Sequence, residues 1–145
     1  CNACPETNPE HATMLRSGLD GQPREIFATG LRNTIGFGWH PATGEMWGAD
    51  HGIDWLGDDE QKEELNRIEK GADYGWPYVY GVGKIQHAVQ SPKGKTKEEW
   101  ARASRQPALL YTAHAAPMQM VFYSGSQFPA EFRGDAFIAM RGSWN

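Results

Sequence analysis

The stretch Gly30-Leu31-Arg32-Asn33 opens the segment of residues 30–77, around which the chain is organised. Two apolar runs follow it, and the turn His40-Pro41-Ala42-Thr43-Gly44 joins them. The second run leads into Asp50-His51-Gly52, and the segment closes on Tyr74-Gly75-Trp76-Pro77. Polar side chains and glycines therefore collect where the predicted strands end. Proteins place sites at such positions because loops carry function while a rigid scaffold holds them.

The composition is that of a globular chain rich in strands and turns. A length of 145 residues fits one ordinary domain. The net charge is −4 and no basic block is present, so electrostatics argue against a nucleic-acid partner. No apolar run approaches the roughly 18 residues of a membrane helix. We therefore expect neither nucleic-acid binding nor a membrane span.

Both cysteines lie in Cys1-Asn2-Ala3-Cys4. A pair with this spacing can be a redox motif, half of a zinc site or a small disulfide. Zinc would need two further ligands, and only His11 lies near. A redox pair usually precedes a helix of a βαβ unit, and no such pattern follows. We favour a local disulfide formed in an oxidising compartment.

Apolar segments separated by turn residues predict an all-β chain. Residues 12–16 and 24–29 flank Asp20-Gly21, which is a strong hairpin signal. Other predicted strands are residues 36–39, 45–49, 65–68, 108–111, 118–123 and 136–140. The polar segment 80–107 is interpreted as an insertion within a single domain of residues 1–145, with a short helix capped by Thr96.

A weak internal repeat indicates a β-propeller. Residues 36–49 and 120–139 each contain an apolar strand, a turn with a glycine followed by an acid, and a second apolar strand. Propeller blades are antiparallel units of four strands in about 40–45 residues. On this reading the chain holds the outer half of one blade, a whole second blade and the inner half of a third. Because so few strands cannot close a propeller, we expect a piece of a longer protein.

Together these motifs resemble the glucose/sorbosone dehydrogenase family, the soluble aldose and sorbosone dehydrogenases that use pyrroloquinoline quinone (PQQ). The resemblance covers about residues 24–79 and 108–145, and the order and spacing of the motifs make it specific. Further motifs that carry it are Asp58-Asp59, Glu64-Leu65-Asn66, His114-x-x-Pro117 and Arg141-Gly142-Ser143-Trp144-Asn145. It implies a six-bladed propeller that is periplasmic or secreted and passes electrons from a sugar, through the quinone, to an external acceptor.

The resemblance also implies a cofactor site at the strand ends. In the family the Arg-Asn pair contacts the cofactor, which carries over to Arg32 and Asn33. The chemistry agrees, because a guanidinium matches a carboxylate bidentately and an amide can both donate and accept. His51 and Arg141 are assigned to the same cofactor.

The resemblance further implies a calcium site and a sugar pocket. Gly52 and Ile53 match the segment whose backbone carbonyls hold the ion, and calcium takes about six to eight oxygen ligands. Some relatives have proline where this chain has Ile53. We expect Trp55, Tyr74 and Trp76 to shape the substrate pocket by stacking.

The family's general base is a histidine in a segment that this chain does not contain. Such a base must take the hydroxyl proton while hydride leaves the same carbon. We therefore expect the chain alone to be inactive. Two other interpretations remain open: a non-catalytic propeller that binds carbohydrate or protein, and a calcium-dependent propeller lactonase. The lactonase would need side chains on the metal, for which Asn33, Asn66 and Asp50 are candidates.

Overall fold

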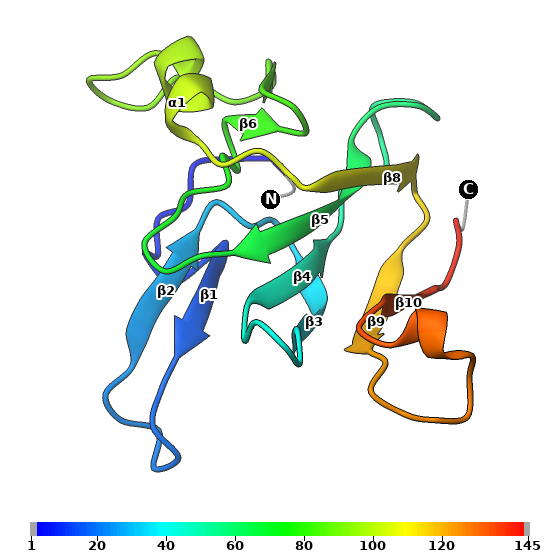
Figure 1. Ribbon diagram of the computed structural model, residues 1–145. Helices are drawn as coiled ribbons and strands as arrows, with labels where there is room; N and C mark the ends of the chain where they lie inside the picture. The colour runs from blue at the N-terminus through cyan, green and yellow to red at the C-terminus, as the bar shows by residue number, and fades with distance from the viewer. Residues whose placement is uncertain (1–2, 144–145) are drawn as a thin grey trace. The chain divides into compact units, whose positions relative to one another are not determined.

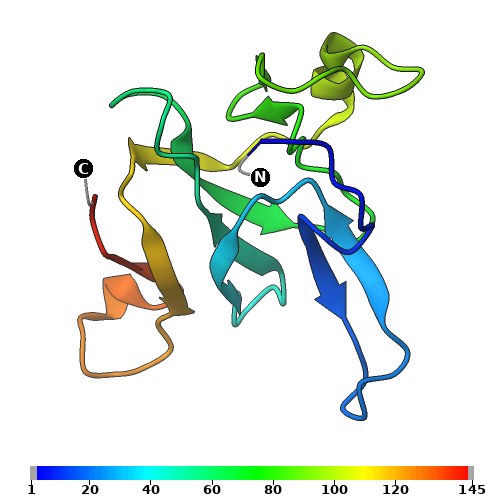
Figure 2. The same cartoon turned by 180° about the vertical axis from the view of Figure 1, so that it is seen from behind.

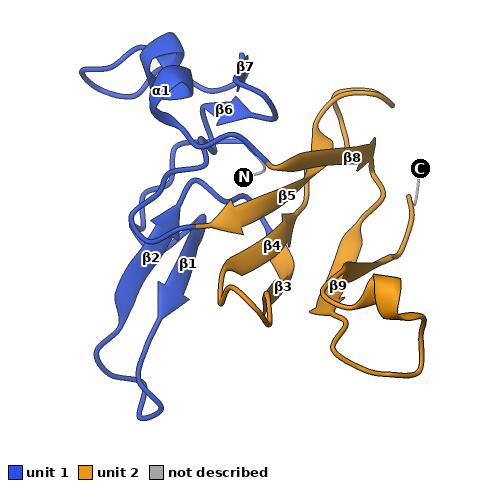
Figure 3. Cartoon of the chain, viewed as in Figure 1, with its two compact units in different colours: residues 1–33, 69–107 blue, residues 34–68, 108–145 orange. Residues whose placement is uncertain are grey.

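Antiparallel β-structure dominates the chain (Figure 1). The computed structural model describes residues 3–143, so the suggested Cys1–Cys4 disulfide lies partly outside the described residues. Two compact units are formed, residues 1–33 with 69–107 and residues 34–68 with 108–145 (Figure 3). We call them unit 1 and unit 2. The polar segment 80–107 belongs to unit 1, and the assignment of the whole chain to a single domain stays a prediction.

Unit 2 contains a four-stranded antiparallel sheet in the order β3-β4-β5-β8. Its strands are β3 (Thr34–Trp39), β4 (Met46–Asp50), β5 (Lys62–Ile68) and β8 (Leu109–Ala113). A two-stranded hairpin of β9 (Pro117–Phe122) and β10 (Ala136–Met140) follows, with the short 3-10 helix η1 (Ala130–Phe132) in its connection (Figure 2). This is the meander of one whole blade followed by half of another.

Close contact between β3 and β9 depends on Gly36. A β-carbon at this position would lie 2.8 Å from Gln119 Cα and 3.0 Å from the Met120 nitrogen. The buried apolar side chains of the unit are Met46, Ala49, Ile53, Ile68, Ala113, Ala116 and Met120. A small residue on the strand lets the two backbones approach, and the core then fills with side chains from the neighbouring positions.

Unit 1 is built on the hairpin of β1 (Thr13–Arg16) and β2 (Glu25–Thr29). The short strands β6 (Val79–Tyr80) and β7 (Lys84–Ile85) pair with each other, and helix α1 (Lys97–Ala103) follows them. The helix starts with a capping box: Thr96 Oγ1 accepts the Glu99 N–H at 3.1 Å, and Glu99 Oε2 accepts the Thr96 N–H at 2.7 Å. The buried apolar side chains of unit 1 are Ala28, Leu31, Tyr74, Trp76, Val79 and Val89.

The predicted strands and the helix are confirmed within a few residues. The two hairpins found in the repeat are β3–β4 and β9–β10, which pair as expected. The strands β6 and β7 were not predicted, because two-residue strands within a polar segment leave no alternation to detect. Within residues 3–143 the structure contains no helix of the length and hydrophobicity that a membrane crossing requires.

Candidate functional site

In unit 1 the motif at residues 30–33 lies against the motif at residues 74–77. The Tyr74 N–H donates to the Thr29 carbonyl at 2.9 Å, and the Trp76 N–H donates to the Gly30 carbonyl at 3.0 Å. Gly30 has a φ of +72°, and a side chain there would collide with Asp73 and Gly75. Only glycine tolerates both the positive φ and the close contacts, so Gly30 allows the two motifs to pair.

The pairing of these motifs places Arg32 beside Trp76. The guanidinium carbon lies 5.5 Å from the centroid of the Trp76 ring, which is within cation–π distance. Trp76 is itself buried and lines a hollow of about 290 Å³ in unit 1, together with Asp73, Tyr78 and Trp100. Asn33 is exposed at the end of the motif. The predicted residues Arg32 and Trp76 are thus brought together.

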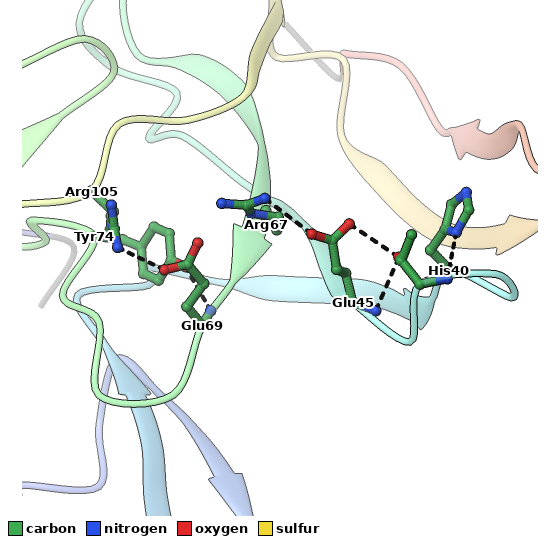
Figure 4. A network of polar contacts seen from close by, with 7 residues as sticks. His40, Glu45, Arg67, Glu69, Tyr74 and Arg105 are labelled. Atoms are coloured by element: carbon green, nitrogen blue, oxygen red, sulfur yellow. Dashed lines mark hydrogen bonds and ion pairs between the residues drawn. The ribbon is translucent and has the colours of Figure 1, made fainter.

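Tyr74 is anchored inside unit 1 (Figure 4). Its side chain is buried, and its hydroxyl accepts the Glu69 N–H at 3.0 Å. The Glu69 carboxylate accepts a hydrogen bond from Arg105 Nη2 at 2.7 Å. These contacts give Tyr74 a structural role in holding residues 69–75, and its predicted contact with a sugar stays a prediction.

In unit 2 the loop after β4 is fixed by hydrogen bonds to buried groups. The Gly52 N–H donates to Glu63 Oε2 at 2.7 Å, and the Ile53 N–H donates to Gln61 Oε1 at 3.1 Å. Glu63 Oε1 accepts a second backbone N–H, that of Ala116, at 3.0 Å. The Glu63 side chain, only 2% exposed, therefore ties the loop to the segment before β9.

Two histidines strengthen this attachment. His51 Nε2 lies 2.5 Å from the Pro117 carbonyl, to which it donates. His114 is buried, and its ring nitrogens face the Gly57 carbonyl at 2.9 Å and the Asp54 carboxylate at 3.3 Å. The hydrogen bond to the Gly57 carbonyl, supported by the Asp54 carboxylate, raises the pKa of His114 above its ordinary value despite the opposing effect of burial.

The same segments carry unusual backbone conformations. Gln61, His114 and Ala116 have φ angles of +53°, +62° and +51°. A left-handed conformation costs a residue other than glycine roughly 1–3 kcal/mol, and such residues concentrate at functional sites. Here they shape the two segments that support the loop of residues 51–57.

The backbone of Arg141 also lies against the segment before β9 in unit 2. Its N–H donates to the Ala116 carbonyl at 3.0 Å, and its side chain is exposed. Trp55, on the supported loop, is also exposed. The structure therefore brings His51, Gly52, Ile53 and Arg141 together around residues 114–117 of unit 2, whereas Arg32, Asn33, Tyr74 and Trp76 belong to unit 1.

Sequence reasoning did not identify Glu63 or Gln61 as part of this arrangement. Both are polar and almost fully buried, at 2% and 3% exposure. The signal that the sequence offers for Glu63 is an acidic residue near the start of β5. Glu60 and Glu64 carry the same signal, so it does not single out Glu63. His114 was noted as part of a motif, and its direction became clear only from its contacts with Asp54 and Gly57.

The position of His114 predicts a pH dependence of stability. A raised pKa means that the folded chain binds the proton more tightly, so the stabilisation is complete below the ordinary pKa of about 6.5 and disappears as the pH rises through the folded value. Urea unfolding followed by NMR signals of unit 2 should show stability falling as the pH rises above this region. His114→Gln should remove that fall, while His87→Gln, at an exposed position of unit 1, should leave it unchanged.

The fold and the supported loop define a class of protein: a chain of β-propeller blades with polar residues at one set of strand ends. The chain belongs to the glucose/sorbosone dehydrogenase family, whose model matches residues 4–142. An uncharacterized protein of Borreliella burgdorferi is 35% identical over 137 residues, which are 94% of this chain and 35% of that protein. The chain thus spans about a third of the length of this relative.

Solved structures agree with this assignment. The soluble aldose sugar dehydrogenase of Escherichia coli, in its apo form, is 27% identical over 80% of this chain and 30% of its own, with a TM-score of 0.58. The PQQ domain of pyranose dehydrogenase from Coprinopsis cinerea, in its holo form, is 20% identical over 86% and 36%, with a TM-score of 0.61. The second likeness concerns the fold alone. The predicted all-β propeller fold and family are thereby confirmed.

Proposed function

We propose that this chain supplies part of the cofactor site of a PQQ-dependent dehydrogenase that oxidises an aldose or sorbosone-type sugar. The observation that carries the proposal is the position of Arg32, held over Trp76 by the paired motifs of unit 1. The guanidinium carbon lies 5.5 Å from the centroid of the Trp76 ring, so a cation–π contact holds the charge beside the indole. A cation held in this way suits the carboxylates of the quinone.

Bound PQQ would act as the acceptor of hydride from the sugar. Two residues of unit 1 would bind and orient it, Arg32 through charge-assisted hydrogen bonds and Asn33 through its amide. The assignment of His51 and Arg141 to the cofactor stays a prediction from the family resemblance. The loop at Gly52 and Ile53 in unit 2 would hold calcium through backbone oxygens. From the family resemblance we expect the general base in a segment outside this chain and a periplasmic or secreted location.

A binding measurement tests the proposal. The chain is titrated with PQQ in the presence of calcium, and the quenching of tryptophan fluorescence is followed. A charged hydrogen bond contributes roughly 1.5–3 kcal/mol, so Arg32→Ala should weaken PQQ binding about ten- to hundredfold. Arg102→Ala, which removes an exposed arginine from α1, should bind as the wild type does.

The same titration separates the alternatives. Quinone binding without reduction of a dye by aldoses is the expected result for this chain, because the general base lies outside it. A well-folded chain that binds no quinone would contradict the proposal and favour a carbohydrate- or protein-binding propeller. Equal PQQ affinity of Arg32→Ala and the wild type would remove Arg32 from the site.

A further inference from the structure

A hollow of about 500 Å³ lies in unit 2 between the ends of its two hairpins. Its walls are the turn that joins β3 to β4 and the two ends of the connection between β9 and β10. The lining includes the polar groups of His40, Ser124, Arg133 and Asp135. Sites for small molecules usually have volumes of about 300–1,000 Å³, so the hollow is large enough to hold one.

This hollow and the loop of residues 51–57 lie at opposite ends of the same strands. The strand β3 begins at Thr34, which pairs with Asp50 beside that loop, and it ends at Trp39, directly before His40. The strand β9 begins at Pro117, whose carbonyl contacts the loop, and ends directly before the hollow. The polar groups of the hollow therefore take no part in the candidate site described above.

The turn after β3 fixes the tautomer of His40. The ring nitrogen Nδ1 accepts the N–H groups of Ala42 and Thr43 at 3.3 and 3.2 Å. Because an accepting ring nitrogen carries no proton, the neutral imidazole has its proton on Nε2. Nε2 faces Gly134, since it would lie 3.7 Å from a β-carbon there, and no described residue accepts a hydrogen bond from it. The ring thus offers one oriented donor to the hollow.

Arg133 and Asp135 bring opposite charges to the same hollow from either side of Gly134. Both side chains are exposed, and neither forms an ion pair or a hydrogen bond within the described part of the chain. Their backbone is fixed, because the Gly134 N–H donates to the Tyr123 carbonyl and the Tyr123 N–H donates to the Asp135 carbonyl, both at 2.9 Å. A ligand would therefore meet these charges without competition from an intramolecular partner.

Aromatic packing holds the connection that carries Arg133 and Asp135. The Tyr123 ring stacks on Phe128 with the ring centroids 4.8 Å apart, and Phe137 packs against these rings at 6.1 and 5.7 Å. The Tyr123 hydroxyl also accepts the Phe128 N–H at 2.6 Å. Surface connections are usually mobile, and these contacts restrain this one. Preorganisation of this kind lowers the ordering cost of binding.

The donors and acceptors indicate the class of ligand. A guanidinium binds a carboxylate through two parallel hydrogen bonds, and the His40 Nε2–H can add a third. The Asp135 carboxylate accepts hydrogen bonds from hydroxyl groups and repels a second negative charge, which disfavours a phosphate dianion. The Ser124 hydroxyl can both donate and accept. This combination suits a ligand with one carboxylate and neighbouring hydroxyl groups.

We propose that the hollow binds a sugar acid, with Arg133 and His40 on the carboxylate and with Asp135 and Ser124 on the hydroxyl groups. The inference goes beyond the proposed function and does not depend on it. An aldonate, the acid that water forms from the lactone of an oxidised aldose, belongs to this class of ligand. The site would therefore respond to the acid that accumulates when an aldose is oxidised.

A binding measurement tests the proposal without any measurement of activity. Sodium gluconate is titrated into the isotope-labelled chain at constant ionic strength, and the amide signals of Ser124 and Gly134 are followed by NMR. The shifts should saturate in the millimolar range. Arg133→Ala should weaken binding about tenfold, the contribution expected of a charge-assisted hydrogen bond at an exposed position. Arg102→Ala, at an exposed arginine of α1 in unit 1, is the matched control and should bind as the wild type does.

Ligand selectivity distinguishes a site for hydroxylated acids from a general attraction of anions. Sodium acetate, which has the carboxylate and no hydroxyl group, should bind the wild type about tenfold more weakly than gluconate. Asp135→Asn should bring the two affinities closer together, because the amide is a weaker acceptor and no longer repels acetate. Neither Arg133→Ala nor Asp135→Asn should change the urea midpoint of unit 2, since neither side chain has an intramolecular partner in the described chain.

The outcomes are distinct. Saturable shifts with gluconate that Arg133→Ala weakens and Arg102→Ala does not change support the proposal. Absence of shifts in the millimolar range, or unchanged gluconate affinity of Arg133→Ala, overturns it. Acetate, inorganic phosphate or zwitterionic alanine that binds as tightly as gluconate overturns the assignment to a sugar acid. None of these results bears on PQQ binding, which the titration of Arg32→Ala tests separately.

Discussion

Gly36→Ala should destabilise unit 2 by about 2–3 kcal/mol, because overpacking a closely packed contact costs roughly 1–3 kcal/mol and occasionally more. The added methyl group would lie 2.8 Å from Gln119 Cα and 2.9 Å from the Gln119 carbonyl carbon. These are backbone atoms of β9, and they cannot rotate away as the end of a flexible side chain could. The strand β9 would have to move away from β3, which would disturb the packing of both hairpins.

Gly38→Ala is the matched control on the same strand. The nearest atoms to a β-carbon at this position are Phe122 Cδ2 at 3.8 Å and the Met120 carbonyl oxygen at 3.9 Å, which are ordinary contacts. Replacing glycine with alanine inside a strand should stabilise by roughly 0.5–1 kcal/mol. Urea unfolding followed by NMR signals of unit 2 measures both variants. Equal stability of Gly36→Ala and Gly38→Ala would mean that β3 and β9 do not approach as described.

Gly52→Ala is expected to have the second large effect, a loss of about 3 kcal/mol or more, from the same overpacking argument. The methyl group would overlap the backbone carbonyl oxygen of Gln61 and approach its carbonyl carbon to 2.8 Å. Relief requires the loop to leave Gln61 and Glu63, which would leave the N–H groups of Gly52 and Ile53 without these acceptors. An unsatisfied buried polar group costs roughly 1–3 kcal/mol, so relaxation does not avoid the loss.

The control for this substitution is Gly57→Ala on the same loop. Gly57 has a φ of +91° and no atom within 4 Å of an added β-carbon, so alanine there meets only a conformational cost of about 1–2 kcal/mol. Gly52→Ala should therefore be the more destabilised variant in urea unfolding. A Gly52→Ala protein that is as stable as Gly57→Ala would contradict the described packing of the loop on Gln61.

Much of the architecture followed from local sequence. The hairpin of β1 and β2 was signalled by Asp20-Gly21, and the capped helix α1 by Thr96 and Glu99. The repeat between β3–β4 and β9–β10 indicated blades, because each copy joins two short apolar strands by a polar turn. Such signals lie within a few residues of one another and need no knowledge of the remaining chain.

The candidate site was only partly accessible in this way. Its motifs could be read from the sequence, and the structure pairs residues 30–33 with residues 74–77. The assignment of Arg32 and Asn33 to the cofactor and of Tyr74 and Trp76 to the sugar stays a prediction. The hydrogen bonds that support the loop of residues 51–57 could not be predicted from the sequence. Glu63 joins the N–H of Gly52, eleven positions earlier, to that of Ala116, fifty-three positions later. Nothing in the neighbourhood of Glu63 distinguishes it from Glu64.

The sequence by itself determined the strands, the glycines that terminate or connect them, and the family to which the chain belongs. These depend on side-chain alternation, turn chemistry and the spacing of motifs, which are local properties. Only the tertiary structure decided that Glu63 and Gln61 face the loop and that His114 reaches Gly57. A buried polar side chain acquires its role from the partner that satisfies it, and folding brings that partner from a distant part of the chain.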